Sequence, residues 1–185
     1  MEQPGQHVVL AGKYRLIRQL GKGGMGSVWY AEHLALESPV AIKLIDPEIA
    51  NNPEALSRFF REAKAAASLR SPHVVQILDH GVDGDTPYIA MEVLEGESLA
   101  TRLDRTKRLS PAETSRIVTQ VARALARAHE ASIVHRDLKP ENVFLVRNDE
   151  EEIAKVLDFG IAKSTSNVLA SSASGSTWSW RESTA

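Results

Sequence analysis

Two short motifs in the second half of the chain carry carboxylate, amide and ammonium groups close together. The first motif is HRDLKPEN at residues 135–142, and the second is DFG at residues 158–160. A carboxylate can accept the proton of a hydroxyl group, carboxylate and amide oxygens can bind Mg²⁺, and a lysine can neutralise a phosphate. These residue types in this order predict chemistry on a nucleoside triphosphate.

A glycine-rich run, GKGGMG at residues 21–26, lies between two strand-like segments, residues 14–20 and 27–32. Glycines at these positions let a hairpin lie over phosphates and offer them backbone N–H groups. A dinucleotide-binding turn needs a helix after the glycines, and a Walker loop needs a lysine before Ser27. Neither feature is present, so a phosphate-covering hairpin and a plain glycine-rich turn both remain open.

The next strand-like segment, residues 39–45, contains the run VAIK, which ends at Lys43. A lysine among buried β-branched residues needs an anionic partner, although a lysine on the polar face of a strand is the commoner case. A helix is predicted over residues 53–69, with Asn52 as its N-cap and Pro53 in its first turn. Glu62 lies in this helix and is a candidate partner of Lys43; the alternative is a surface acid that pairs with Arg58 or faces water.

The remaining elements alternate between strands and helices. Strands at residues 74–78 and 87–93, joined by a turn at 79–86, would complete a five-stranded antiparallel sheet. A short helix to about residue 107 precedes a longer one, residues 111–131, which opens with a capping box of Ser110 and Glu113. Two strands follow, residues 143–146 and 153–157. The longer helix carries an apolar stripe of Ile117, Val121, Leu125 and Ala128, so one of its faces should be buried.

Composition excludes several classes of protein. The chain has 185 residues, of which 43% are hydrophobic and 25% charged, as is typical of a globular domain. Its net charge of −2 argues against nucleic-acid binding, and it lacks both an apolar run of membrane-spanning length and a signal-peptide core. There is no cysteine, hence no disulfide and no thiol nucleophile, and no histidine pair has zinc-ligand spacing. A cytoplasmic protein is expected.

The motifs HRDLxxxN and DFG, in this order, are the signature of protein kinases, and the chain resembles a bacterial serine/threonine kinase of the eukaryote-like (Hanks) type. Val28 after the glycines and Lys43 in VAIK also match the family pattern. The resemblance runs from residue 14 to about residue 163 and implies an α+β, protein-kinase-like fold. After a leader (residues 1–13), an N-lobe (14–94) would hold the five-stranded antiparallel sheet with one helix, and a partial, mainly helical C-lobe (95–163) would follow.

The resemblance assigns catalytic roles and the cofactors ATP and Mg²⁺. Asp137 would accept or orient the proton of the substrate hydroxyl, and Lys139 would contact the γ-phosphate. Lys43, held by Glu62, would bind the α- and β-phosphates. The Mg²⁺ ligands would be Asn142 and Asp158.

The same resemblance predicts a nucleotide site. The glycine loop over the phosphates would consist of Gly21, Lys22, Gly23, Gly24, Met25 and Gly26. Val28, Ala41 and Phe144 would enclose the adenine ring, with Met91 behind it and the backbone of Glu92 to Leu94 along its edge. A methionine in an apolar strand is, however, more often part of the core.

The resemblance ends after Lys163. Half of the last 22 residues are serine or threonine, and we expect this tail, residues 164–185, to be disordered. The family's Ala-Pro-Glu motif and its later C-lobe helices are not found. We therefore expect an incomplete C-lobe, in which the apolar stripe around Ile117 needs a partner to cover it. Two functions follow: a serine/threonine kinase acting on proteins, or a non-catalytic ATP-binding or interaction module, such as a pseudokinase or gene fragment.

Overall fold

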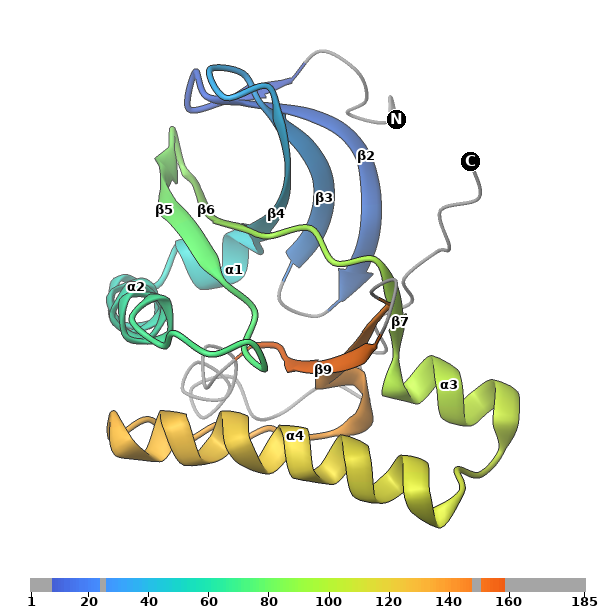
Figure 1. The fold of residues 1–185 in the computed structure, drawn as a ribbon. Helices are drawn as coiled ribbons and strands as arrows, with labels where there is room; N and C mark the ends of the chain where they lie inside the picture. The colour runs from blue at the N-terminus through green and yellow to red at the C-terminus, as the bar shows by residue number, and fades with distance from the viewer. Residues whose placement is uncertain (1–7, 24–25, 148–150, 159–185) are drawn as a thin grey trace.

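A curved sheet of six strands forms the upper part of the molecule in Figure 1. The structure is a computed structural model and describes residues 8–23, 26–147 and 151–158, without the side chains of residues 48, 49, 58 and 62. All neighbouring strands are antiparallel, in the order β1-β2-β3-β4-β6-β5. Their bounds are Val9–Leu10 (β1), Tyr14–Gly23 (β2), Gly26–His33 (β3), Ser38–Ile45 (β4), Ile77–Asp83 (β5) and Thr86–Met91 (β6).

The five expected strands are present, although one of them is displaced along the chain, and β1 is an additional short strand in the segment that we assigned to the leader. Val9 pairs with Arg15 and Leu10 with Tyr14. Leu10 and Tyr14 are buried because their side chains enter a core cluster with Trp29 and Ile42. The first residues of the described chain are therefore part of the sheet.

The position of β5 differs from the prediction, which placed a strand at residues 74–78 and a turn at 79–86. The strand begins at Ile77, and Asp79 and His80 lie within it. We took these polar residues for a turn, but β5 is an edge strand, where polar side chains reach solvent or a neighbour. The Asp79 carboxylate accepts hydrogen bonds from Lys13 Nζ (3.1 Å) and Tyr14 Oη (2.9 Å). The true turn is at Gly84, whose φ is +56°.

Two helices accompany this sheet, a single-turn α1 (Pro47–Ala50) and the predicted α2 (Pro53–Ala67). Asn52 begins α2 as expected, because its Oδ1 accepts hydrogen bonds from the backbone N–H groups of Glu54 and Ala55. The inner face of α2 buries Phe59, Ala63 and Ala66 in the largest core cluster.

A second, smaller sheet lies below the first, in the order β7-β8-β9 (Figure 1). Its strands are Gly96–Ser98 (β7), Val143–Arg147 (β8) and Glu152–Val156 (β9). The helices of this part are α3 (Leu99–Thr106) and α4 (Pro111–Glu130), and a 3₁₀ turn, η1 (Pro140–Asn142), leads into β8. The predicted capping box at the start of α4 is confirmed. Within the described residues, no helix is both long and apolar enough to cross a membrane.

The apolar stripe of α4 is covered by the chain itself, contrary to our expectation. Ile117 is 4% exposed and Val121 9% exposed, and both belong to one cluster with Leu145, Ala154 and Val156 of β8 and β9. Leu125 is half-buried against the same cluster. We had assigned this stripe to later helices, whereas the β8–β9 hairpin supplies the apolar surface that it requires. The premise for a partner that covers this face was wrong.

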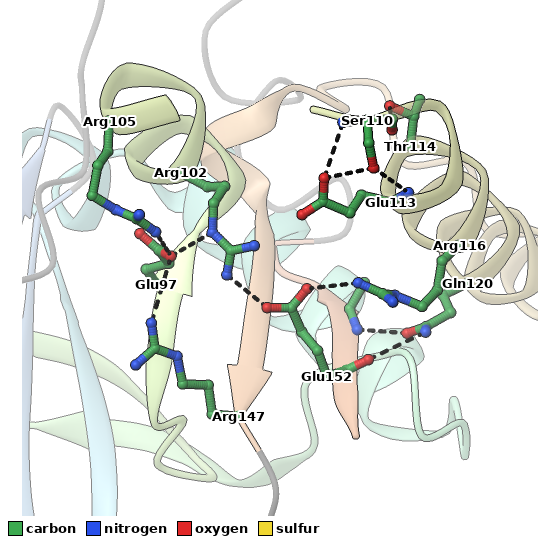
Figure 2. Close-up of polar contacts among 11 residues, drawn as sticks. Glu97, Arg102, Arg105, Ser110, Glu113, Thr114, Arg116, Gln120, Arg147 and Glu152 are labelled. Carbon is green, nitrogen blue, oxygen red and sulfur yellow. Dashed lines mark hydrogen bonds and ion pairs between the residues drawn. The ribbon is translucent and has the colours of Figure 1, made fainter. Parts of the chain in front are cut away.

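A network of charged side chains joins β7, α3 and β9 (Figure 2). Glu97, only 6% exposed, accepts hydrogen bonds from Arg102 Nε (2.5 Å) and Arg105 Nη2 (2.6 Å). The other end of the Arg102 guanidinium lies 2.6 Å from Glu152. Burial acts to raise the pKa of the Glu97 carboxyl, but the bonds from the two arginines outweigh it and hold this pKa below its usual range.

This lowered pKa predicts how the stability should depend on pH. At pH 7, Glu97→Gln should lower the free energy of unfolding by about 1.5–3 kcal/mol, the contribution of hydrogen bonds to charged groups. A group with a lowered pKa contributes fully above its unfolded-state pKa, about 4.3, and loses that contribution as the pH falls through the folded-state pKa. Urea unfolding should show a constant difference from the parent between pH 7 and about pH 5, which shrinks at lower pH.

Glu130→Gln is the matched control, because Glu130 forms an exposed pair with Arg127 on α4. Its effect should stay below about 0.5 kcal/mol. Equal effects of the two substitutions would contradict a stabilising role of the Glu97 network.

Candidate active site

An open pocket lies between the two sheets, with about 530 Å³ of empty space that includes open solvent, and brings together eight of the predicted site residues. Strands β2, β3 and β4 contribute its upper wall, the end of β6 and the segment after it one side, and the end of η1 with the residues after β9 the floor. Most of the wall is apolar, and Lys43, Asn142 and Asp158 supply polar groups. The lining residues are Leu20, Val28, Ala41, Lys43, Val75, Met91, Glu92, Leu94, Asn142, Leu157 and Asp158.

The ammonium group of Lys43 is buried at this cavity and is paired across the two sheets. Its side chain is 3% exposed, and Nζ lies 2.8 Å from Oδ1 of Asp158, whose side chain is 20% exposed. A buried charge is costly unless it is paired, so this contact ties the position of Asp158 to that of β4. Glu62 belongs to α2, but its side chain is not described, and the predicted Lys43–Glu62 pair stays a prediction.

The predicted catalytic residues form one connected group before β8. Asn142 Nδ2 donates to the backbone oxygen of Asp137 (2.8 Å) and to its Oδ2 (3.3 Å). Lys139 Nζ lies 3.4 Å from the same carboxylate oxygen. Asn142 thus directs its amide nitrogen at Asp137 and, since it also lines the cavity, connects Asp137 with the cavity.

His135 holds this group against the residue that precedes Asp158. The ring is 2% exposed, and Nε2 lies 2.7 Å from the Leu157 carbonyl oxygen. Because a carbonyl can only accept, Nε2 carries the proton, and Nδ1 accepts a hydrogen bond from Asp137 N–H at 3.3 Å. A further hydrogen bond, from Leu157 N–H to the backbone carbonyl oxygen of Asn142 (2.9 Å), joins the same two segments.

Two residues of the site have left-handed backbone conformations. The φ angles of Arg136 and Asp158 are +61° and +50°. Such angles are strained for residues other than glycine and persist only where surrounding contacts enforce them. The bonds of His135 and the Lys43–Asp158 pair are contacts of this kind.

The glycine-rich segment forms the end of β2 and the start of β3. Gly21, Lys22 and Gly23 belong to β2, and Gly23 pairs with Gly26. Gly26 has a φ of +130°, and a Cβ atom there would lie 1.9 Å from the Leu44 carbonyl oxygen, so only glycine fits. Gly24 and Met25 lie outside the described residues.

The structure places five of the predicted adenine-site residues in the cavity wall: Val28, Ala41, Met91, Glu92 and Leu94. Phe144 differs, because it is 1% exposed and packs in a cluster with Val75 and Leu157, and is not among the lining residues. Sequence reasoning missed Leu20, Val75 and Leu157. Leu20 directly precedes the glycines and Leu157 directly precedes Asp158, so adjacency to a motif was the available signal. Val75 had none.

Glu92 is fixed by contacts to Gln76, which precedes β5, and to Lys155 on β9. Its N–H donates to the Gln76 oxygen (3.0 Å), and its carboxylate accepts from Gln76 N–H (2.8 Å). Lys155 Nζ, on β9, lies 2.6 Å from the same carboxylate. The N–H of Glu92 is therefore occupied.

The fold and the site together are those of a protein kinase domain, and the chain belongs to the protein kinase domain family, which matches residues 14–181. It is 41% identical over 158 residues to the serine/threonine-protein kinase PrkC of Bacillus subtilis, which covers 85% of this chain and 24% of PrkC. It is 43% identical over 157 residues to the serine/threonine-protein kinase PknH of Mycobacterium tuberculosis, which covers 84% of this chain and 24% of PknH.

Among solved structures, the kinase domain of Mycobacterium tuberculosis PknI matches with a TM-score of 0.77 and 34% identity. The match covers 87% of this chain and 64% of that domain. The chain thus spans about a quarter of the length of the curated relatives and less than two thirds of the solved kinase domain. The recognised family and the protein-kinase-like fold are confirmed.

The contacts of His135 predict a large effect on stability. His135→Ala removes two hydrogen bonds, leaves the Leu157 carbonyl oxygen without its ring donor and opens a buried space. We expect the free energy of unfolding to fall by about 2–4 kcal/mol in urea unfolding at pH 8. His129→Ala, at the exposed end of α4, is the matched control and should change it by less than about 0.5 kcal/mol. Similar losses in both variants would contradict the positioning role of His135.

Proposed function

We propose that this chain transfers the γ-phosphoryl group of ATP to serine or threonine hydroxyl groups of proteins. The observation that carries the proposal is the convergence of Lys43, Asn142 and Asp158 on one cavity, with Asp137 bonded to Asn142. The names of the relatives, all serine/threonine-protein kinases, support the same reaction and the same substrate class. A cytoplasmic location belongs to the proposal, because the ATP that the reaction requires is held inside the cell.

The donor set fits Mg²⁺. Asp158 offers a carboxylate, and Asn142 offers its amide oxygen, since its amide nitrogen is engaged by Asp137. In the described part of the chain no cluster of three or more histidine, aspartate or glutamate side chains forms a separate metal site. Two protein oxygens suit Mg²⁺, which usually completes its coordination with water and substrate phosphates. When bound, Mg²⁺ would neutralise the charge that develops on the phosphate oxygens.

The cavity fits the other parts of ATP. Val28 and Ala41 lie on the side of the N-lobe sheet and Leu157 on the floor, so a flat ring between them would contact apolar atoms. The backbone of Glu92 to Leu94 would bind its edge, with Met91 behind it. The glycine segment, residues 21–26, would cover the phosphates with backbone N–H groups, and Lys43 would bind the α- and β-phosphates.

Asp137 and Lys139 would act on the transferred group. The substrate oxygen bonds to the γ-phosphorus while the bond from this phosphorus to the β–γ bridging oxygen breaks, and the hydroxyl proton passes to Asp137. Lys139, 3.4 Å from the Asp137 carboxylate, would neutralise the γ-phosphoryl oxygens. Glu62 would hold Lys43, and a protein with an exposed serine or threonine would be the second substrate.

Nucleotide binding can be tested by thermal unfolding. Mg·ATP at one hundred times its Kd should stabilise the folded chain by about 2.7 kcal/mol and raise the Tm by roughly 5–11 °C. Lys43→Met and Asp158→Ala should each reduce this shift, measured against the ligand-free Tm of the same variant. The controls Lys64→Met and Asp104→Ala, at exposed positions on α2 and α3, should retain it. An unchanged melting curve of the folded parent at millimolar Mg·ATP would contradict the proposal.

Catalysis by Asp137 predicts a different result. Asp137→Asn should lower the turnover of a serine/threonine peptide by about 10²–10⁴-fold, because the proton acceptor is lost, and should leave the Kd of ATP nearly unchanged. The exposed Asp104→Asn serves as control and should keep full turnover. Equal turnover in Asp137→Asn and the parent would remove Asp137 from the reaction. A parent that binds Mg·ATP without transferring phosphate would favour the non-catalytic module instead.

A further inference from the structure

Strand β9 is the outer strand of the smaller sheet and ends two residues before Asp158. In an antiparallel pair, alternate residues direct their N–H and C=O groups toward the partner strand and away from it. Glu152, Ala154 and Val156 direct theirs away from β8. An outer strand with such groups normally pairs with another strand or faces water.

The outward groups of β9 instead bond to the Gln120 side chain of α4 and to residues 73–75, which lie between α2 and β5. Ala154 N–H donates to Gln120 Oε1 (2.6 Å), and Gln120 Nε2 donates to the Glu152 carbonyl oxygen (3.3 Å). The Ala154 oxygen lies 3.1 Å from Nδ1 of His73, and Val156 N–H donates to the His73 oxygen (2.8 Å). The last of these hydrogen bonds runs from Val75 N–H to the Val156 backbone carbonyl oxygen (3.1 Å).

Gln120, on α4, takes the place of one residue of a neighbouring strand. Its carboxamide presents one acceptor and one donor, which match the N–H of Ala154 and the C=O of Glu152. Because both groups are used, the carboxamide has a single orientation, and β9 has a single position along α4. A shift of β9 by one residue would break both bonds and would turn every side chain of the strand to the opposite face.

The start of β9 is held a second time, by charge (Figure 2). Arg102 Nη2 lies 2.6 Å from one carboxylate oxygen of Glu152, and Arg116 Nη2 lies 3.6 Å from the other. The Arg102 side chain is 11% exposed, so solvent screens its pair less than it screens a surface pair. Arg102 also bonds to Glu97, which extends the contact to β7.

We propose that Gln120 is a positioning residue: it fixes the register of β9 and thereby the place of Asp158 at the cavity. The connection runs along the strand to Leu157, whose N–H and C=O are bonded to Asn142 and His135. The inference rests on the proposed function in one respect, namely that Asp158 is a ligand of Mg²⁺.

The first measurement needs no ligand. In Gln120→Met, which has a similar length but no carboxamide, the amide of Ala154 should exchange its hydrogen about tenfold faster, as expected for one lost hydrogen bond. The amide of Leu157 should also exchange faster, and the amides of β2 and β3 should be unchanged. Gln120→Glu keeps an acceptor for Ala154 N–H but places an oxygen against the Glu152 oxygen, so its effect should be intermediate. Thr119→Ala, whose hydroxyl bonds only within α4, is the matched control.

The second measurement reads the position of Asp158. The Kd of ATP is determined with Mg²⁺ and again with EDTA, and the ratio of the Kd in EDTA to the Kd in Mg²⁺ reports the metal ligands. Gln120→Met should reduce this ratio several-fold while leaving the Kd in EDTA nearly unchanged. A residue that only stabilised the fold would lower the Tm and leave the ratio intact.

Normal exchange at Ala154 in a folded Gln120→Met chain would overturn the inference. Faster exchange at Ala154 with normal exchange at Leu157 and an unchanged Mg²⁺ ratio would overturn it as well, because the bond would then not reach Asp158. If the parent itself binds no ATP in Mg²⁺, the proposed function fails. The exchange at Ala154 and Leu157 then decides by itself whether Gln120 holds the end of β9.

Discussion

The ammonium group of Lys43 is a positive charge with almost no access to water, and its pairing with Asp158 joins the two sheets. Lys43 is on the central strand β4 of the larger sheet, whereas Asp158, at 2.8 Å, follows the outer strand of the smaller one. Removing a charge from water costs several kcal/mol unless a well-placed partner offsets it. The two sheets must therefore hold a fixed relation at this point, and both members of the pair line the cavity between the sheets.

The short segment around residues 73–75 completes that relation. It lies between α2 and β5, yet its backbone bonds to β9, with Val74 and Val156 forming a parallel bridge. Helix α4 supports β9 from the other side through Ile117 and Val121. Strand β9, which leads to Asp158, thus contacts both the segment 73–75 and helix α4. Such dense, buried support is what allows Asp158 to keep a strained φ of +50°.

Local patterns in the sequence were sufficient wherever the neighbours along the chain decide the structure. The capping residues Asn52 and Ser110, with Glu113, begin α2 and α4 as predicted, because a cap bonds to N–H groups two or three residues away. The alternating pattern in the first part of β2 and the glycines at its end were equally local signals. The spacing of the motifs also identified the family, and Asn142 of the first motif and Asp158 of the second both line the cavity.

What the sequence determined by itself is therefore the longer helices and most of the strands, with the helix caps and the chemical groups of the site, but not β1, α1, β7 or η1. The tertiary structure decided the contacts between distant segments. Phe144 packs behind Leu157, and Asp79 extends a strand because Lys13 and Tyr14 reach it from more than sixty residues away. The stripe of α4 meets β8 and β9, and Gln120 supplies a backbone-like partner to an edge strand. These outcomes depend on which surfaces pack against one another. The sequence pattern of one segment does not identify the distant segment that it contacts.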